Sequence, residues 1–443
     1  MTSQNTQWLA RSLSSVWHPC TQMRHHEAGL AQSLPLIPIA RAEGAWLEDF
    51  DGNRYLDGIS SWWTNLFGHG DPRIKDAVKA QLDELEHVML AGFTHRPVVE
   101  LSERLSALMG GTLGHAFYAS DGASATEIAL KLSFHGWRNS GQPEKDRFLC
   151  LENSYHGETV GALAVTDVAL FKDAYAPLVR QGQTVASPAP RPNETPEAAA
   201  IRAAADLEAT LQANAGRIAA LIVEPLIQCA AGMQMHSPEY LRRARALCDT
   251  HGVHLICDEI AVGFGRSGSF FAHEQAGICP DLLCLSKGIT GGTLPLSAVL
   301  STEAIYRAFY DTDTTRGFLH SHSYTGNPLA CRAALAVLDI FAADAVIEAN
   351  QTLAQKLGQA IQPLAAHPQV RNLRQQGMIL AFDVACDDPA FSRCFYRAAL
   401  QRHTLLRPIG NTVYWMPPYI VGDAEIAQLA QVTQEALKEA LAG

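Results

Sequence analysis

The chain has 443 residues, 47% of them hydrophobic, and a formal net charge of -11 at pH 7. This length predicts two or three domains around at least one large core. The acidic balance argues against nucleic acid or an anionic membrane as the main partner. We find neither a run of about 18 apolar residues nor a signal-peptide pattern, so we expect a cytoplasmic protein without a transmembrane helix.

A β-hairpin is predicted near the N-terminus, where WLEDFDGNRYLDG places an Asp-Gly turn between alternating apolar positions. From Asp71 onward, helical patterns alternate with short, continuously apolar strands. The strand candidates are 115–120, 147–153, 217–225, 254–260, 281–289 and 294–302. This alternation predicts an α/β fold with a mainly parallel sheet covered by helices.

Three parts are expected along the chain. Residues 71–325 form the large α/β domain, and residues 326–443, with long helices followed by two strand candidates, form a smaller α+β domain. The segment 1–70 joins the smaller domain. Ten scattered cysteines without a CxxC pair indicate a reducing compartment and no disulfide framework.

The strongest chemical signal is the pair Asp258 and Lys287, each at the end of a short apolar strand candidate. Ligands of open α/β sheets bind at the carboxyl ends of strands, so both side chains could face one ligand. A lysine can form an imine with the aldehyde of pyridoxal phosphate (PLP). A carboxylate can keep the pyridine nitrogen of that cofactor protonated. The spacing alone also fits a structural salt bridge, which we rate as the commoner case.

Three weaker signals point to the same kind of site. The small residues of Ser120–Ser124, between a strand and a helix, could bring backbone N–H groups to an anion, although they also fit a plain helix cap. Tyr155 could stack on a planar ring or pack on the core. Arg407 could bind a substrate carboxylate or simply lie at the surface.

One glycine motif is misleading. Residues 263–268, GFGRSG, match GxGxxG, but a dinucleotide site needs the glycines to open a helix directly after a strand. No clear helix follows, so the motif argues against a nicotinamide or flavin site. The histidines His25, His26, His320 and His322 lack a convincing ligand set, and we predict no metal.

Four segments occur in one order: IVEPLIQCAAGM, LICDEIAVGFGRSGSFFAHEQAGICPD, LCLSKGITGG and SYTGNPLACRAAL. Together they resemble the class III aminotransferases, PLP enzymes of fold type I, and the resemblance runs from about Trp17 to Tyr419. It implies an amino-group transfer with PLP as cofactor. It also implies a large domain with a mainly parallel, seven-stranded type of sheet, plus a smaller α+β domain.

Within this class, Trp17-His18-Pro19, Trp62-Trp63 and Arg407-Pro408 resemble the members that convert 8-amino-7-oxononanoate to 7,8-diaminononanoate in biotin biosynthesis. Their usual amino donor is S-adenosylmethionine, in a ping-pong reaction. Cys20 stands where some members carry a substrate-contacting tyrosine, and Glu158 where an aspartate is common. Because some relatives use lysine as the donor, Cys20 leaves the donor open.

The resemblance implies a role for each matching position. Lys287 would hold the cofactor as a Schiff base and move the proton, Asp258 would pair with the pyridine nitrogen, and Tyr155 would stack on the ring. The cofactor phosphate would be bound by Gly122 and Ala123, and by His322 and Ser323 from the second subunit of a homodimer.

The positions implied in substrate binding lie elsewhere in the sequence. Arg407 would bind the carboxylate of the keto acid, and Trp62 would line the channel for its aliphatic chain. The remaining positions expected near the substrates are Cys20, Trp63, Ser321 and Tyr414. Three alternatives stay open: another class III enzyme, which is an ω-amino acid or diamine aminotransferase or an aminomutase; a non-catalytic PLP-fold regulator or binding protein; and, as a residual option, a nicotinamide enzyme.

Overall fold

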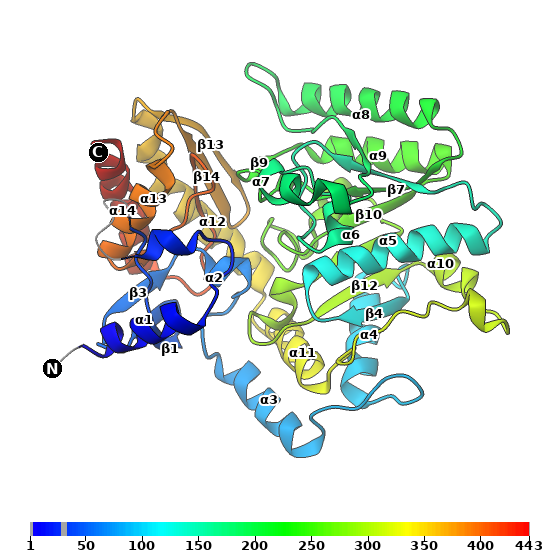
Figure 1. Cartoon of the computed structure of the whole chain (residues 1–443), viewed down its shortest axis with the longest axis horizontal. Coiled ribbons are helices and arrows are strands. Elements are labelled where there is room, and N and C mark those ends of the chain that lie inside the picture. Colours follow the sequence, from blue (N-terminus) through cyan, green and yellow to red (C-terminus); the bar gives the residue numbers. More distant parts are fainter. Residues whose placement is uncertain (1–2, 28–32, 443) are drawn as a thin grey trace. The chain divides into compact units, whose positions relative to one another are not determined.

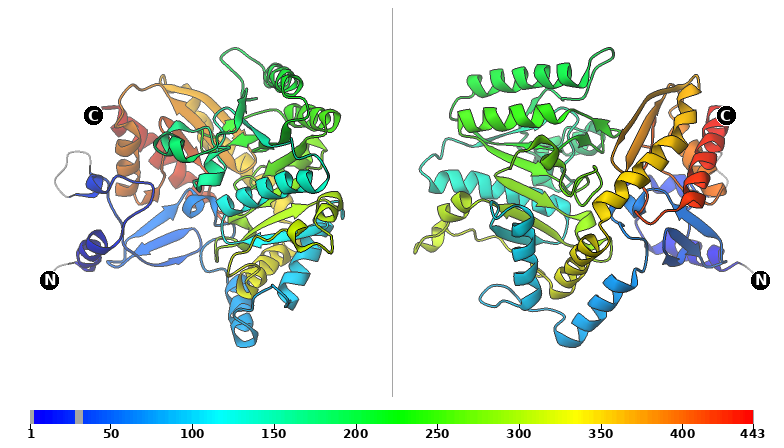
Figure 2. Two further views of the ribbon diagram at one scale, coloured as in Figure 1. Left: turned by 45° about the vertical axis from the view of Figure 1, so that its right-hand side comes forward. Right: turned by 180° about the vertical axis from the view of Figure 1, so that it is seen from behind.

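The computed structural model describes residues 3–27 and 33–442. The chain divides into a smaller unit, Met1–Pro72 with Asn350–Gly443, and a larger unit, Arg73–Ala349. This division differs from the boundary predicted at residue 326. Helix α11 (Pro328–Ala343) packs against α4 (Arg96–Leu108) and buries most of its residues, so it belongs to the core of the larger unit (Figure 2).

The larger unit is built on one seven-stranded sheet. Six strands run parallel to one another, and β12 runs antiparallel to both of its neighbours, β11 and β4. The mainly parallel sheet predicted from the sequence is therefore confirmed. In spatial order the strands are β4 (His115–Ala119), β12 (Ser297–Ser301), β11 (Leu282–Leu285), β10 (His254–Asp258), β7 (Ile218–Val223), β5 (Arg147–Leu151) and β6 (Gln183–Val185).

Helices pack on this sheet through apolar faces. Helix α5 (Gly122–Asn139) contacts β7, β11 and β12, and its Ile128 joins Ile222 and Ile256 in one buried cluster (Figure 1). Helices α8 (Pro196–Ala213) and α9 (Pro238–His251) lie side by side. Both begin with a capping hydroxyl followed by proline, a strong start signal for a helix.

The remaining helices, 3-10 turns and strands complete the larger unit. They are α3 (Pro72–Glu84), α6 (Val160–Leu163), α7 (Ala169–Lys172), η2 (Asp173–Leu178), β8 (Ile227–Gln228), β9 (Gln234–Met235), η3 (Ala272–Ala276), η4 (Lys287–Thr290), α10 (Glu303–Ala308) and η5 (Thr314–Arg316). The first helical element after the GFGRSG motif is the short 3-10 turn η3, so these glycines do not open an α-helix.

The smaller unit has two sheets. The predicted hairpin is present as β2 (Trp46–Asp49) and β3 (Arg54–Asp57), flanked by β1 (Ile39–Glu43) and β15 (Thr404–Leu405). An antiparallel sheet contains β13 (Val370–Gln376), β14 (Ile379–Val384) and β16 (Thr412–Trp415). Helices and 3-10 turns complete this unit: α1 (Gln4–Ser15), η1 (Met23–His26), α2 (Ser60–Trp63), α12 (Val346–Ile361), η6 (Gln362–Ala366), α13 (Phe391–Gln401) and α14 (Asp423–Ala442).

Within the described part of the chain, no helix combines the length and the apolar character that crossing a membrane requires.

Candidate active site

Asp258 and Lys287 leave the sheet from neighbouring strands. Asp258 ends β10 and pairs in register with Cys284 of β11, three residues before Lys287. Lys287 lies in the short connection that returns from β11 to the antiparallel β12, and its backbone φ is 46°. A positive φ in a non-glycine residue stores local strain, which is common at functional positions. The two side chains interact electrostatically, because the charge of Asp258 raises the pKa of Lys287.

The net pKa shift of Lys287 is downward. Burial lowers the pKa of its amine, while Asp258, Cys229 and Glu224 act in the opposite direction. A lysine whose pKa is lowered by burial supplies more of the neutral amine, which is the form that attacks a carbonyl carbon.

Asp258 is held by a histidine that the sequence analysis did not single out. His156 Nδ1 lies 2.7 Å from Asp258 Oδ2, and both side chains are buried. The backbone N–H of Ile260 donates to Asp258 Oδ1 at 3.0 Å. Nε2 of His156 is buried and has no hydrogen-bond partner among the described residues. The sequence offered a signal, since His156 follows Tyr155 directly.

Tyr155 lies in the loop after β5, and hydrogen bonds hold both its backbone and its side-chain hydroxyl. Its backbone N–H donates to Glu224 at 3.0 Å, and its hydroxyl donates to Glu158 at 2.8 Å. The ring of Phe171 meets the tyrosine ring edge-on, with centroids 5.2 Å apart. Glu158, the position that departs from the usual aspartate, therefore orients the tyrosine hydroxyl.

Gly122 and Ala123 open the 18-residue helix α5, so their N–H groups lie at its amino end, where backbone donors lack partners inside the helix. Asp121 caps this helix by accepting from the backbone N–H of Ser124 at 2.9 Å. A Cβ at Gly122 would lie 2.9 Å from the side chain of Ile260, two residues after Asp258. Glycine is therefore needed where this helix end approaches the end of β10.

Ser321, His322 and Ser323 lie in the segment before α11, where both serines are exposed. His322 Nε2 lies 3.0 Å from His320 Nε2, and Lys131 on α5 lies 2.8 Å from His320 Nδ1. The side chains of Lys131, His320 and His322 are thus in contact one after another and link α5 to His322. The role of His322 and Ser323 in phosphate binding, and of Ser321 near the substrate, stays a prediction.

In the smaller unit, Trp62 and Trp63, which the sequence analysis placed near the substrates, lie on a left-handed turn. All four residues of Ser60–Trp63 have φ between 44° and 72°. Asp57 stabilises this turn by accepting from the backbone N–H of Ser61 at 2.9 Å and from its hydroxyl at 2.7 Å. Left-handed conformations cost L-residues energy, so their persistence over four residues indicates a constrained, functional segment.

The two tryptophans have different surroundings. Trp63 is 5% exposed, and its indole N–H donates to the Tyr414 hydroxyl at 3.1 Å. Trp62 is 43% exposed, and the guanidinium carbon of Arg407 lies 4.9 Å from the centroid of its ring. Arg407 also donates to the backbone carbonyl of Cys20 at 2.8 Å. The hydrogen bond from Arg407 thus reaches the backbone oxygen of Cys20.

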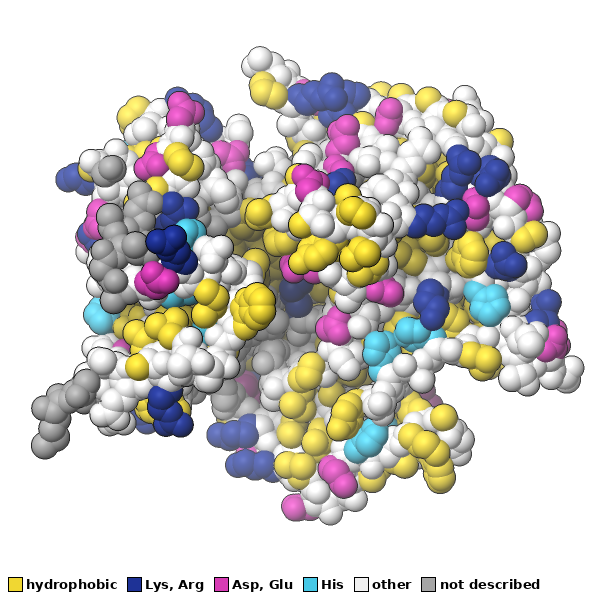
Figure 3. Space-filling view, viewed as in Figure 1, with side chains coloured by type: hydrophobic (Ala, Val, Ile, Leu, Met, Phe, Trp, Pro, Cys, Tyr) yellow, Lys and Arg dark blue, Asp and Glu magenta, His cyan; other side chains and the backbone are white. Residues whose placement is uncertain are grey.

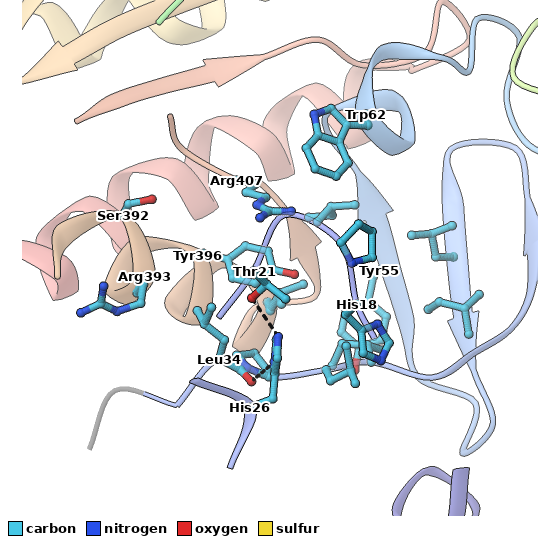
Figure 4. A pocket seen from close by; sticks show the side chains of 18 residues that line it. His18, Thr21, His26, Leu34, Tyr55, Trp62, Ser392, Arg393, Tyr396 and Arg407 are labelled. Carbon is cyan, nitrogen blue, oxygen red and sulfur yellow. Dashed lines mark hydrogen bonds between the residues drawn. The ribbon is translucent and has the colours of Figure 1, made fainter. Parts of the chain in front are cut away.

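Trp62 and Arg407 line a cavity of about 400 Å³ within the smaller unit. Figure 4 shows Arg407 between Trp62 and Tyr396. Burial raises the pKa of Tyr396, and the charge of Arg407 opposes this shift. Tyr396 is a candidate substrate residue that the sequence analysis missed, because α13 has no motif around it. Leucine, isoleucine and proline side chains form most of the remaining wall, and none of the described lining residues is Asp or Glu.

Residues 29–437 match the family of class III aminotransferases. The chain belongs to this family. A relative from Helicobacter pylori, adenosylmethionine-8-amino-7-oxononanoate aminotransferase, is 46% identical over 437 residues, which cover 97% of each chain. The enzyme of the same name from Geobacter sulfurreducens is 37% identical, over 97% of this chain and 96% of the relative. The family predicted from the sequence is confirmed.

Solved structures of class III aminotransferases share this fold. That of adenosylmethionine-8-amino-7-oxononanoate aminotransferase from Methanocaldococcus jannaschii has a TM-score of 0.91 at 31% identity, over 98% of this chain and 99% of that chain. An (S)-enantioselective omega-transaminase from Thermomicrobium roseum has a TM-score of 0.93 at 30% identity, with the same coverage.

PLP is the cofactor of this aminotransferase, and the residues at the strand ends suit it. A buried lysine with a lowered pKa can link to the aldehyde, and a buried aspartate fixed by His156 and Ile260 can face the pyridine nitrogen. The amino end of α5, kept open by Gly122, suits a phosphate.

Proposed function

We propose that this class III aminotransferase transfers an amino group from S-adenosylmethionine to 8-amino-7-oxononanoate, giving 7,8-diaminononanoate for biotin biosynthesis. The observation that carries the proposal is the Arg407–Trp62 pair in a cavity with apolar walls and no acidic residue in its described lining. A long apolar chain that ends in a carboxylate matches such a lining. The relatives that bear this activity in their names support the assignment.

The residues of the larger unit handle the cofactor and the proton. Bound PLP supplies an electron-withdrawing ring that stabilises the electron pair left when a substrate carbon loses its proton. Lys287 Nζ would anchor the cofactor and would act as the general base that takes the proton from the substrate carbon. Asp258 would face the pyridine nitrogen and favour its protonated form, Tyr155 would stack on the ring, and the N–H groups of Gly122 and Ala123 would bind the phosphate.

The residues of the smaller unit bind the acceptor. Arg407 binds the carboxylate of the acceptor through a bidentate guanidinium contact. The Trp62 indole covers the aliphatic chain of the acceptor. Trp63 and Tyr414 fix each other and the left-handed turn, and Cys20 positions Arg407 through its carbonyl oxygen. Because the amino group would stay on the cofactor between the two half-reactions, the deaminated donor would leave before the acceptor binds.

We also propose a homodimer in which Ser321, His322 and Ser323 act at the neighbouring subunit's site. Large apolar side chains around this segment support an interface, because extended exposed apolar patches mark association surfaces. They are Met89, Phe93, Leu319 and Tyr324, each more than half exposed. Figure 3 shows hydrophobic side chains gathered on this face of the larger unit. Sedimentation at micromolar protein should give about twice the mass of the 48.0 kDa chain, and a monomer would contradict the dimer.

Separate half-reactions test the substrates. S-adenosylmethionine should bleach the visible band of the PLP-loaded enzyme, which lies near 410–420 nm as an approximate property of lysine-bound PLP. Subsequent 8-amino-7-oxononanoate should restore the band. Bleaching by lysine in place of S-adenosylmethionine would change the donor and leave the acceptor assignment intact.

A second candidate function is an ω-amino acid or diamine aminotransferase. It is favoured by the TM-score of 0.93 to the Thermomicrobium roseum omega-transaminase. Restoration of the band by simple ω-keto acids or aldehydes, without restoration by 8-amino-7-oxononanoate, would select this alternative.

A further inference from the structure

Glu224 is a buried carboxyl group that the proposed mechanism does not use. It follows the last residue of β7, Val223, which pairs in register with Cys257 of β10. Glu224 and Asp258 are therefore the next residues on adjacent parallel strands, and both are buried. Two neighbouring carboxyl groups at one sheet edge are unfavourable without partners, so their contacts have to compensate.

The carboxylate of Glu224 joins two segments of the site. Oε2 accepts from the backbone N–H of Tyr155 at 3.0 Å, and Oε1 accepts from the backbone N–H of Cys229 at 3.0 Å. Tyr155 is the proposed ring-stacking residue, and Cys229 interacts electrostatically with Lys287. Each oxygen thus holds one backbone segment, and a side-chain amide could replace only one of these two acceptors.

The charged and titratable groups around Glu224 lie on the segments that follow the neighbouring strands. Burial raises the pKa of Glu224 to about 7, His156 opposes this shift, and the charge of Asp258 adds to it. Lys287 responds in turn, because the charge of Glu224 raises its pKa. On the remaining side, His236 Nε2 lies 3.1 Å from the backbone carbonyl oxygen of Glu224.

We propose that Glu224 is a positioning residue for the cofactor, which clamps the backbone of Tyr155 and Cys229 beside the strand end that carries Asp258. This inference rests on the cofactor placement proposed above. The clamp would hold the backbone of Tyr155 in place for stacking on the cofactor ring. A negative charge on Glu224 would favour the protonated form of the lysine-bound cofactor.

Glu224→Gln tests both parts, because it keeps the size of the side chain and removes one acceptor and the charge. We expect PLP to bind about tenfold more weakly, since one buried N–H loses its acceptor. In a pH titration of the visible band, the midpoint should fall by about half a unit or more, since a nearby negative charge is lost. Both readouts use the enzyme with cofactor and without turnover.

Glu259→Gln is the matched control. Glu259 is also buried, and it also accepts two backbone N–H bonds, from Ala272 at 2.6 Å and His273 at 2.8 Å, while the His273 Nδ1 atom lies 2.7 Å from its Oε1. Neither Ala272 nor His273 is among the proposed site residues. This variant should lower the melting temperature and leave PLP affinity and the titration midpoint at the wild-type values.

Two results would overturn the inference: wild-type PLP affinity and midpoint in Glu224→Gln, or equal changes in both variants. If Glu224→Gln does not fold, Glu224→Asp tests the clamp by itself, because it keeps the charge and shortens the side chain. It should then weaken PLP binding with little shift of the midpoint, and unchanged binding would refute the clamp. Failure of the proposed cofactor site looks different, since the wild-type protein would then show no visible band with PLP.

Discussion

Arg407 lies against the face of the Trp62 indole, 4.9 Å from the ring centroid, and donates to the Cys20 carbonyl at 2.8 Å. These two contacts fix the guanidinium before a substrate arrives, which lowers the entropy lost on binding a carboxylate. The stacked arginine also explains why an indole adjoins a proposed anion site.

For Arg407→Ala we expect the acceptor half-reaction to slow by about 10- to 100-fold at low acceptor concentration, because a charge-assisted, two-pronged contact is lost. The donor half-reaction should keep most of its rate. Stopped-flow measurement of each half-reaction checks this, with Arg41→Ala, which removes an exposed arginine paired with Glu48, as the control. Equal slowing of both halves would contradict a carboxylate role.

Lys287→Ala should fold, bind PLP without the visible band of the lysine-bound cofactor, and lose transamination. Removing a buried amine whose pKa is already lowered by burial leaves no unpaired buried cation behind. Absorbance spectra, melting temperature and turnover give the three readouts. Transamination at more than about a hundredth of the wild-type rate would mean that another group moves the proton.

Gly122→Ala should weaken PLP binding by about tenfold, because the new Cβ would lie 2.9 Å from Ile260 and would displace the amino end of α5. The double variant with Ile260→Ala removes the obstructing side chain and should recover part of the affinity. A double-mutant cycle on the PLP dissociation constant measures this coupling. Additive effects of the two substitutions would argue against the contact.

His254 makes stability depend on pH. Burial lowers its pKa to about 4, below the value of about 6.5 expected in the unfolded chain. Since only the unfolded state then takes up a proton, the stability from this group is full above pH 6.5 and is lost as pH falls towards 4. The difference of about 2.5 units corresponds to an upper limit of about 3 kcal/mol.

His254→Phe keeps a flat ring against Trp137, whose centroid lies 4.2 Å from that of His254. Between pH 7.5 and pH 4.5, the wild-type protein should lose more resistance to urea than this variant does. Parallel pH profiles of the two urea midpoints would show that His254 is not the responsible group.

The residue pattern predicted the parallel sheet and placed Asp258 and Lys287 at strand ends, although it also fitted a structural salt bridge between them. Continuous apolar strand candidates indicated the sheet, and Asp258 and Lys287 each end one of these apolar runs. This succeeded because buried parallel strands leave little choice of residue type, and polar groups collect where the strands end.

Other site features depend on the register between strands, which local sequence does not reveal. His156 and Glu224 act through contacts with residues 102 and 69 positions away along the chain. The left-handed turn at Ser60–Trp63 runs against the preference of all its residues and exists because Asp57 and Met416 bind its serines. The boundary predicted at residue 326 differs from the division in the structure because the apolar face of α11 is buried in the larger unit.

The segment that carries Lys287 connects β11 to β12, and these two strands are paired antiparallel neighbours in the sheet. Within this segment, Ser286 Oγ donates to the Leu296 carbonyl at 2.9 Å, and Thr290 Oγ1 to that of Leu294 at 2.5 Å. Local opening around Lys287 would therefore have to break these two hydrogen bonds, next to two interior strands of the sheet. Amide hydrogens of β11 and β12 should exchange with deuterium only as fast as the whole unit unfolds.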